Sequence, residues 1–298
     1  MFFTITHTTR YTYDQPVLLE PHLVRLRPRS DWNQQLHHFE LTVDPAPLHR
    51  AQNLELDGNA ALLLRFAGPC DHLELRVHST VETLCANPFT FLLDPASGSL
   101  PLGYEKDLAR LLAPYCRPQV EEETVVQFAQ DLAHQAGGQT LPFLSALNQR
   151  IYTVCAGELR PEGDPLPAAQ TLTRGQGACR DLALLFMDSC RALGLAARFV
   201  SGYHAGTEAQ EERYLHAWAE VYLPGGGWRG YDPSQGLAVA DRHVALAAGP
   251  TPAEARPLVG SFRGSGASSR MSVQMDILTS ASLPQNAIPP SHSSPRSP

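Results

Sequence analysis

The stretch TLTRGQGACRDLALLFMDSCRALGLAARFVSGY, residues 171–203, decides the fold because it joins a glycine-containing loop to an apolar helix and then to a strand. Apolar residues recur at helical spacing between Cys179 and Gly194, beside a narrow charged strip, which predicts a mostly buried helix. Gly194 is a suitable helix stop, and residues 197–203 are rich in the β-branched and aromatic residues of a strand. The helix that begins near Cys179 is therefore expected to pack against a sheet.

Cys179 is a candidate nucleophile because it falls at the predicted N-terminus of this helix. Unpaired N–H groups and the positive end of the helix dipole favour a thiolate there. Gly175 and Gly177 allow the preceding loop to turn sharply, although no Ser, Thr, Asp or Asn directly precedes Cys179 as an N-cap. The alternative for any free cysteine is a small buried hydrophobic residue, and Cys190, deeper on an apolar face, fits that alternative better.

A second stretch, HAWAEVYLPGGGWRGYDPSQG at residues 216–236, predicts a hairpin of two short strands around a proline and three glycines. His216 opens the first strand and Asp232 closes the second, so an antiparallel pairing brings both to one end of the sheet. Attack on a carbonyl carbon needs a thiolate, an imidazole that carries the proton and a carboxylate that orients the imidazole. Glu220 shares the face of His216 and is the alternative carboxylate, while His216 and Asp232 are also compatible with structural roles.

Together the two stretches resemble the bacterial transglutaminase-like cysteine peptidase family. The likeness lies in the cysteine on its helix, the His-x-Trp-x-Glu strand and the Asp-Pro pair, in family order and close to family spacing. It extends to RYTYDQPVLLEPHLVRLRPR at residues 10–29, which is similar to the opening of the family's N-terminal β-domain, and to RPLVGSFRG at residues 256–264. The resemblance covers residues 1–278 and implies that Cys179, His216 and Asp232 form a catalytic triad.

The resemblance implies a thioester acyl-enzyme rather than one substrate, because the superfamily includes protein cross-linkers, peptidases and amidases as well as members with no known activity. We expect a hydrolase of a peptide or other carboxamide, with a peptide or protein as its partner and water as acyl acceptor. Acyl transfer to an amine and a catalytically silent binding protein are the alternatives. The Cys179 N–H is one natural oxyanion donor, and Gln176 is either a second donor or a solvent-facing loop residue.

The whole chain predicts an α+β protein of two domains. Residues 1–84 form short alternating segments without a helix pattern, with Asp57-Gly58 as a hairpin signal, and predict an antiparallel β-sandwich-like domain. A linker is expected at residues 85–103. Residues 104–278 then predict a papain-like, transglutaminase-like domain with its cysteine helix packed on an antiparallel sheet.

Further elements are expected on either side of the two central stretches. The pattern predicts helices from Leu108, around residues 125–132 and at residues 141–152, and a final strand at residues 270–278. The Ser and Pro content of residues 279–298 predicts a disordered tail.

Composition excludes several other classes of protein. The net charge is -7 without a basic cluster, which argues against nucleic-acid binding and against an anionic membrane surface. The opening MFFTITHTTRYTYD lacks a basic leader before an apolar run, and no apolar stretch is long enough to span a bilayer, so a cytoplasmic protein is expected. The 6 cysteines form no regular framework and the 12 histidines no metal-binding motif, so neither a disulfide scaffold nor a metal or other cofactor is expected. Nothing in the pattern predicts an oligomeric state.

Overall fold

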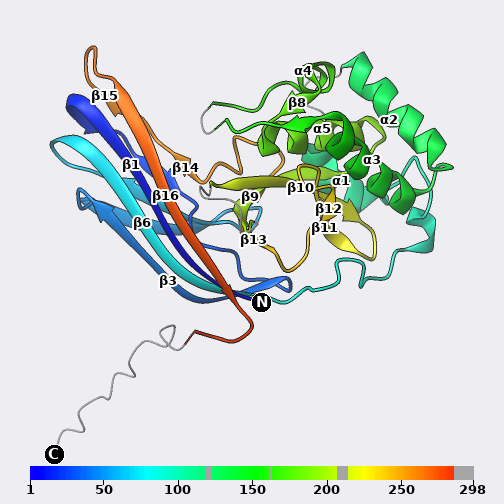
Figure 1. The fold of residues 1–298 in the computed structure, drawn as a ribbon, viewed down its shortest axis with the longest axis horizontal. Helices are drawn as coiled ribbons and strands as arrows, with labels where there is room; N and C mark the ends of the chain where they lie inside the picture. The colour runs from blue at the N-terminus through cyan, green and yellow to red at the C-terminus, as the bar shows by residue number, and fades with distance from the viewer. Residues whose placement is uncertain (118–121, 161–162, 207–213, 285–298) are drawn as a thin grey trace, which may run out of the picture.

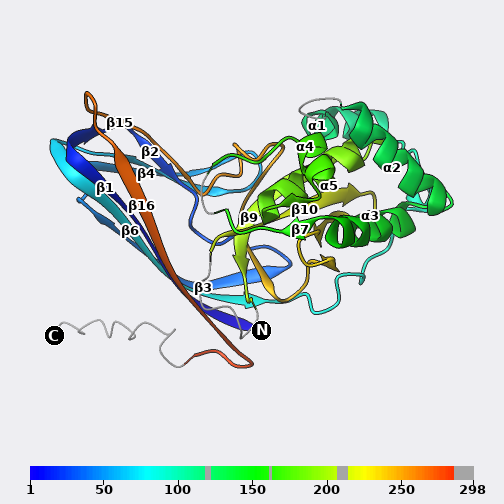
Figure 2. The ribbon, with the colours of Figure 1, turned by 45° about the horizontal axis from the view of Figure 1, so that its top comes forward.

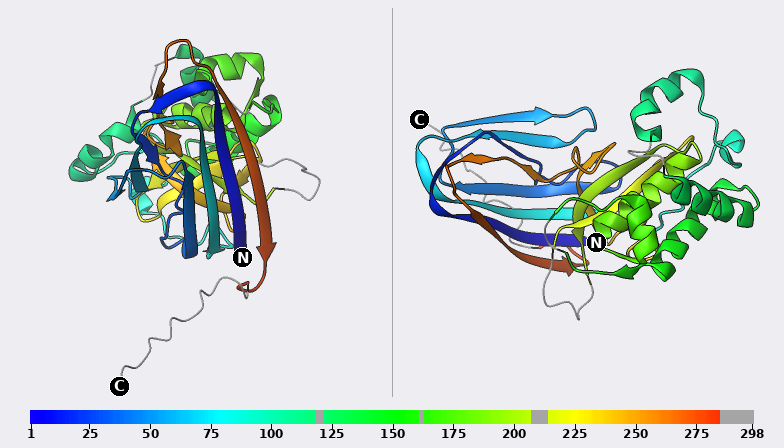
Figure 3. Two further views of the ribbon diagram at one scale, coloured as in Figure 1. Left: turned by 90° about the vertical axis from the view of Figure 1, so that its left-hand side faces the viewer. Right: turned by 90° about the horizontal axis from the view of Figure 1, so that it is seen from above.

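The computed structural model describes residues 1–117, 122–160, 163–206 and 214–284 of the 298-residue chain. A strand-rich half, blue and orange, and a helix-rich half, mostly green, lie side by side (Figure 1). Figure 2 and Figure 3 show the same arrangement from further directions. The predicted α+β class is confirmed, with an antiparallel β-sandwich followed by helices packed on an antiparallel sheet. No helix within the described ranges is long and apolar enough to cross a membrane.

The strand-rich half is a sandwich of two antiparallel sheets. Its strands are β1 (Phe2–Leu19), β2 (His22–Val24), β3 (Gln34–Asp44), β4 (His49–Leu54), β5 (Ala60–Arg65), β6 (Pro69–Thr83), β14 (Leu258–Val259), β15 (Phe262–Arg263) and β16 (Ser269–Ser280). One sheet has the order β15-β1-β6-β3, with β16 also paired to β1, and the other has the order β14-β2-β5-β4. Residues of β1 alternate in burial, so that Phe3 and Ile5 face the core. The predicted hairpin at Asp57-Gly58 joins β4 to β5, with Gly58 in the left-handed region at φ 77°.

The last strands of the chain return to this sandwich. β16 pairs antiparallel with residues 2–13 of β1, and the two lie side by side as the orange and blue strands of Figure 1. β14 and β15 pair with β2 and β1. The strand predicted at residues 270–278 is therefore present, but it pairs within the N-terminal sandwich, whereas the prediction assigned it to the second domain, residues 104–278. Pairing between the two ends of a chain leaves no local sequence signal. The tail expected at residues 279–298 begins inside β16, and residues 285–298 lie outside the described part of the chain.

The helix-rich half packs its helices against a five-stranded antiparallel sheet. In order, its described helices are the short 3-10 helix η1 (Pro95–Ser97), α1 (Lys106–Cys116), α2 (Glu123–Gln135), α3 (Thr140–Val154), α4 (Ala168–Arg174) and α5 (Cys179–Ala192). The sheet has the order β12 (Leu237–Ala238), β11 (Gly227–Asp232), β10 (His216–Leu223), β9 (Ala197–His204) and β13 (His243–Gly249). A small parallel pair, β7 (Ala156–Gly157) with β8 (Gln176–Gly177), lies beside the start of α5. The predicted helices and hairpin are present, whereas the sequence pattern does not indicate α4 or β13.

α5 is the central helix of this half. Leu182, Leu185 and Phe186 are at most 1% exposed and belong to a core cluster with residues of α3, β9 and β10. Arg191, in the charged strip of α5, is also buried and donates hydrogen bonds to carbonyl oxygens of α1, β9 and the segment after β13. Asp181, Asp188 and Arg191 of this strip are therefore part of the packed interior, as a helix surrounded by other elements requires.

The two halves are joined along β13, the edge strand of the second sheet. The side-chain amide of Gln34 donates to the carbonyl of Ala245 (3.0 Å) and accepts from its N–H (2.7 Å). Asn59 makes the same pair of bonds with Ala248, both at 2.8 Å. These amides satisfy backbone groups that an edge strand would otherwise leave unpaired. Since Tyr203 of β9 also packs in the sandwich core, the halves form one packed unit.

Candidate active site

A cleft of about 990 Å³ lies between the two halves, and both contribute to its walls. Strands β1 and β16 supply one wall, which includes Tyr11, Met271 and Val273. The start of α5 and strands β9 and β10 supply another, which includes Cys179 and His216. A molecule bound in the cleft would therefore contact both halves of the chain.

Cys179 is the first residue of α5, as predicted. The helix begins without a capping side chain at Ala178, and Asp181 in the first turn accepts a hydrogen bond from the Ala178 N–H instead (2.8 Å). This is the return half of a capping box, in which a first-turn side chain bonds to the N-cap backbone. Gly177 is required beside it, because a Cβ there would lie 2.9 Å from the Cβ of Asp181.

The same carboxylate ties the helix start to the rim of the cleft. Oδ1 of Asp181 accepts hydrogen bonds from Arg160 Nη2 (2.5 Å) and from the N–H of Leu166 (2.8 Å). The Asp181 side chain is 0% exposed, and Arg160 lines the cleft. A half-buried ion pair thus links the start of α5, and with it Cys179, to a neighbouring segment.

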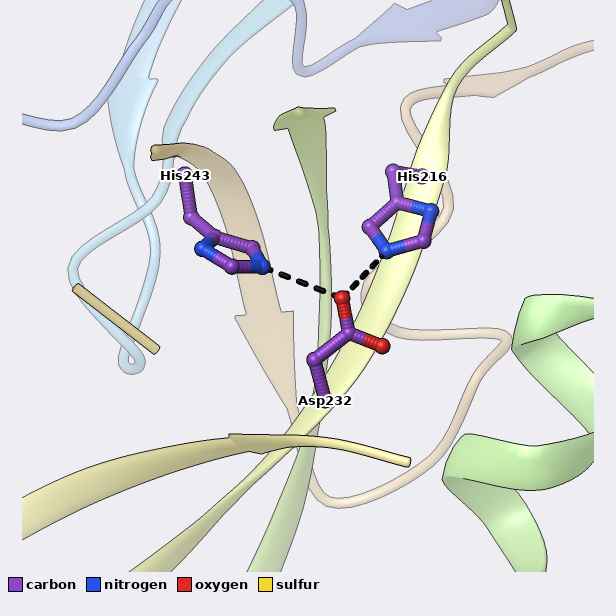
Figure 4. Close-up of side chains that lie close together, drawn as sticks. All are labelled: His216, Asp232 and His243. Carbon is purple, nitrogen blue, oxygen red and sulfur yellow. Dashed lines mark hydrogen bonds and ion pairs between the residues drawn. The ribbon is translucent and has the colours of Figure 1, made fainter. Parts of the chain in front are cut away.

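The hairpin of β10 and β11 brings His216 and Asp232 together. Its register pairs Ala219 with Tyr231, so the start of β10 and the end of β11 share one end of the sheet. His216 Nε2 lies 2.7 Å from Asp232 Oδ2 (Figure 4). The other oxygen, Oδ1, accepts hydrogen bonds from the N–H and the hydroxyl of Ser234 (3.0 and 2.7 Å). The carboxylate is fully buried and fixed on both oxygens.

His216 connects this carboxylate to Cys179. The imidazole lies close enough to Cys179 for its charge and hydrogen-bonding capacity to lower the pKa of the thiol, and because Nε2 faces Asp232, the ring nitrogen left for the sulfur is Nδ1. The structure therefore brings the three predicted site residues together, with Asp232 bonded to His216 and His216 beside Cys179.

Charge and hydrogen bonding shift the pKa of each member of the series. Burial alone would raise the pKa of the Cys179 thiol, but the charge and hydrogen bond of His216 hold it below its usual value. Burial alone would lower the pKa of His216, whereas Asp232 and Cys179 raise it well above its usual value. Burial opposes ionisation of Asp232 as well, and the charge of His216 together with the hydrogen bonds of His216 and His243 keeps the pKa of Asp232 well below the usual range. Both shifts favour the ion pair of a thiolate with an imidazolium over the neutral thiol and imidazole.

The alternative residues have other partners. Glu220, the alternative carboxylate, forms an ion pair with Arg198 at 2.6 Å, so Asp232 is the carboxylate that faces His216. Cys190 is fully buried, and burial raises its pKa well above the usual value, in agreement with an inert core residue. Gln176 is exposed in β8 and does not line the cleft, in agreement with its interpretation as a solvent-facing residue.

Sequence reasoning missed two histidines of the site. His243, at the start of β13, has its Nε2 3.0 Å from Asp232 Oδ2, and His204 stands opposite it on β9. The rings of His204 and His243 have centroids 4.7 Å apart. Nδ1 of His204 accepts a hydrogen bond from the Gly206 N–H, and burial lowers the pKa of His204 to about 3, so this ring is neutral. The short apolar run after His243 is the one signal that could have indicated β13.

Among the described residues, one group of three has ligand atoms close enough to hold a metal ion: His216, Asp232 and His243. Their donor atoms lie within 4.8 Å of one another. Both ring nitrogens already face the same carboxylate oxygen at hydrogen-bond distance. Hydrogen bonds therefore account for how these side chains are arranged.

Comparisons with known proteins agree with this architecture. The bacterial transglutaminase-like N-terminal region matches residues 3–82, and the transglutaminase-like superfamily matches residues 127–233. An uncharacterised protein of Mycobacterium tuberculosis is 27% identical over 290 residues, which cover 93% of this chain and 92% of that protein. A related uncharacterised protein of Mycobacterium leprae is 22% identical over 286 residues, 88% of this chain and 94% of that protein.

The fold also has a solved counterpart. The crystal structure of a candidate cysteine protease from Cytophaga hutchinsonii matches with a TM-score of 0.69 and 22% identity, covering 95% of this chain and 93% of that chain. At this identity the likeness concerns the fold. Residues 127–233 thus belong to the transglutaminase-like superfamily, and residues 3–82 to the N-terminal region of bacterial transglutaminase-like proteins.

Proposed function

We propose that this protein is a thiol-dependent hydrolase that cleaves a peptide bond or another carboxamide through a thioester on Cys179. The observation that supports this most is that Asp232 is hydrogen-bonded to His216, and that His216 lies beside Cys179 at the cleft and lowers the pKa of its thiol. A thiolate beside an imidazolium is both a strong nucleophile and a ready source of one proton.

The residues account for each bond that forms and breaks. The Cys179 sulfur attacks the amide carbon, and the C–N bond breaks as His216 passes its proton to the leaving amine. Water then attacks the thioester carbon and gives a proton to His216, and the C–S bond breaks to release a carboxylic acid and the thiolate. Asp232 keeps the imidazole oriented through Nε2, so that Nδ1 serves the reacting atoms.

The start of α5 supplies a donor for the developing oxyanion. The first four N–H groups of a helix have no partner within it, and the Cys179 N–H is the first of them. In this position it points from the positive end of the helix dipole, which stabilises negative charge on the tetrahedral intermediate.

The walls of the cleft favour a peptide or protein substrate. Tyr11, Met271 and Val273 of the sandwich offer aromatic and apolar surface opposite Cys179's half of the cleft, which suits the side chains of an extended chain. In this proposal the N-terminal half helps to bind substrate as well as to support the second sheet.

The test is a library of peptides incubated with the protein and an excess of a labelled primary amine, with products followed by mass spectrometry. We expect the wild-type protein to release free carboxylic acids rather than amine adducts, because transfer requires the amine to exclude water from the thioester. Cys179→Ala should release no carboxylic acid. A dominant amine adduct would identify a transferase. No turnover of any amide would favour a silent binding protein.

A further inference from the structure

The Asp232 carboxylate has a second histidine partner that the proposed mechanism does not use. His243 Nε2 lies 3.0 Å from Oδ2, the oxygen that faces His216 Nε2 at 2.7 Å (Figure 4). Oδ1 already accepts two hydrogen bonds from Ser234. Of these four donors, the one from His243 comes from a strand outside the hairpin that carries the other groups.

The strand that carries His243 is fixed from its outer side. The amides of Gln34 and Asn59 hold the backbone of β13 at Ala245 and Ala248, two and five residues after His243. Four amide–backbone bonds of 2.7–3.0 Å leave little freedom for this edge strand to shift. The N-terminal half therefore sets the position from which His243 reaches Asp232.

Packing restricts the imidazole from its inner side. A Cβ at Gly202 would lie 2.2 Å from the Val244 carbonyl oxygen and 2.5 Å from the ring of Trp218, so the glycine lets both come close. The Trp218 ring is nearly perpendicular to the His243 ring, with centroids 5.2 Å apart. His243 is 6% exposed and is held with Nε2 toward the carboxylate.

The chemistry of the ring fits a hydrogen-bond donor better than a packing element. Nδ1 of His243 has no hydrogen-bond partner among the described residues, and a buried polar atom without a partner costs stability that an apolar side chain of similar size would avoid. The charged or titratable groups that face the ring are Asp232, His216, His204 and Arg242. Burial lowers the pKa of His243, so its ring is neutral and carries its proton on Nε2.

We propose that His243 is a positioning residue, whose Nε2–H fixes the Asp232 carboxylate so that Oδ2 stays aligned with His216 Nε2. This inference rests on the hydrolase function proposed above. It assigns the N-terminal half a second role, since that half holds the strand from which His243 acts.

The test compares two substitutions that differ in their hydrogen-bonding capacity. His243→Leu removes the donor, whereas His243→Gln can place an amide N–H near the position of Nε2. The first readout is the rate of alkylation by iodoacetamide at Cys179, which peptide mapping separates from alkylation at the other cysteines. The second readout is the Tm of each variant. We expect His243→Leu to slow this reaction about tenfold and His243→Gln to retain most of the wild-type rate. If His243→Leu does not fold, the flexible His243→Met supplies the variant without a donor.

A matched control separates positioning from packing. The control is His22→Leu, since His22 is also a buried histidine, lies in the sandwich and is hydrogen-bonded to the Glu20 carbonyl. The Tm of this variant should change, while Cys179 should be alkylated at the wild-type rate. The positioning role would be overturned if His243→Leu and His243→Gln slowed Cys179 alkylation equally and also lowered the Tm equally. An unchanged or faster rate in His243→Leu would also overturn it and leave the proposed function intact. Absence of selective Cys179 alkylation in the wild-type protein would refute the proposed function itself.

Discussion

Replacing Asp181 with alanine tests how the helix start that carries Cys179 is built. The carboxylate accepts three hydrogen bonds, from the N–H groups of Ala178 and Leu166 and from the guanidinium of Arg160. Its side chain is 0% exposed, so solvent does not compete for these three bonds in the native protein. Asp181→Ala therefore leaves the Ala178 N–H buried without its acceptor and separates a guanidinium from its counter-charge.

The expected cost follows from these contacts. Removing one partner of a buried ion pair costs about 3–5 kcal/mol of folding stability. Arg160 retains 27% exposure and has Glu158 as a second partner at 3.6 Å, so we expect the lower end, about 3 kcal/mol. Asp181→Asn keeps the shape and one acceptor oxygen and should cost about 1–2 kcal/mol.

Urea unfolding followed by tryptophan fluorescence measures the change, with Trp218 as a buried reporter at 1% exposure. The control is Asp107→Ala, which removes another first-turn aspartate, in α1, whose side chain is 93% exposed. It should cost less than about 0.5 kcal/mol. If Asp181→Ala shifts the midpoint no more than this control, with the same denaturant dependence, the buried carboxylate does not hold the helix start.

Three further outcomes are expected. Cys179 should be the fastest of the 6 thiols to react with iodoacetamide. Because the pKa of Cys179 is lowered while that of Cys190 is raised, the preference for Cys179 should widen as pH falls from about 9 to about 6. Preferential labelling of Cys190 in peptide maps would contradict this. His216→Ala should remove most of the rate advantage, because burial alone then raises the Cys179 pKa, and Asp232→Asn should weaken it less; an unchanged rate with an unchanged Tm for His216→Ala would show that the pairing is wrong. Elemental analysis should find less than stoichiometric zinc, and a chelator should leave Cys179 alkylation unchanged, since His216 and His243 already face Asp232. A tightly bound metal whose removal abolishes activity would refute the thiol mechanism as stated.

The members of the candidate triad could be proposed from sequence because each has a local signal. Helical periodicity and two glycines mark the start of α5 at Cys179. Proline and glycines mark the hairpin, and antiparallel pairing then brings His216 and Asp232 to one end of the sheet. Strand register decides between Asp232 and Glu220, and sequence does not fix it to one residue. In the structure Glu220 pairs with Arg198, and Asp232 faces His216.

His243 could not be predicted because its role depends on non-local packing. β13 pairs with β9, not with the hairpin, and its sequence is a short run without strong β-branched character. The packing around it depends on Gly202 of β9, where a Cβ would clash with Trp218 of β10 and with the backbone of Val244 in β13 itself. None of these relations is visible as spacing or periodicity.

Two other features escaped for related reasons. The cap of α5 comes from Asp181 inside the helix, whereas the usual signal is a polar residue before it. The pairing of β16 with β1 joins opposite ends of the chain, so the boundary expected at residue 278 falls in a strand of the first domain. In both cases a tertiary contact replaces the local signal.

Acylation of Cys179 during turnover is tested most directly by rapid acid quenching of the protein with a cleaved peptide, followed by mapping of the adduct. Acid preserves a thioester, whose mass identifies both the acyl group and the modified residue. We expect one acyl group on Cys179 in the wild-type protein, and neither adduct nor cleavage in Cys179→Ala. An adduct on another residue, or cleavage that persists in Cys179→Ala, would contradict the thioester mechanism.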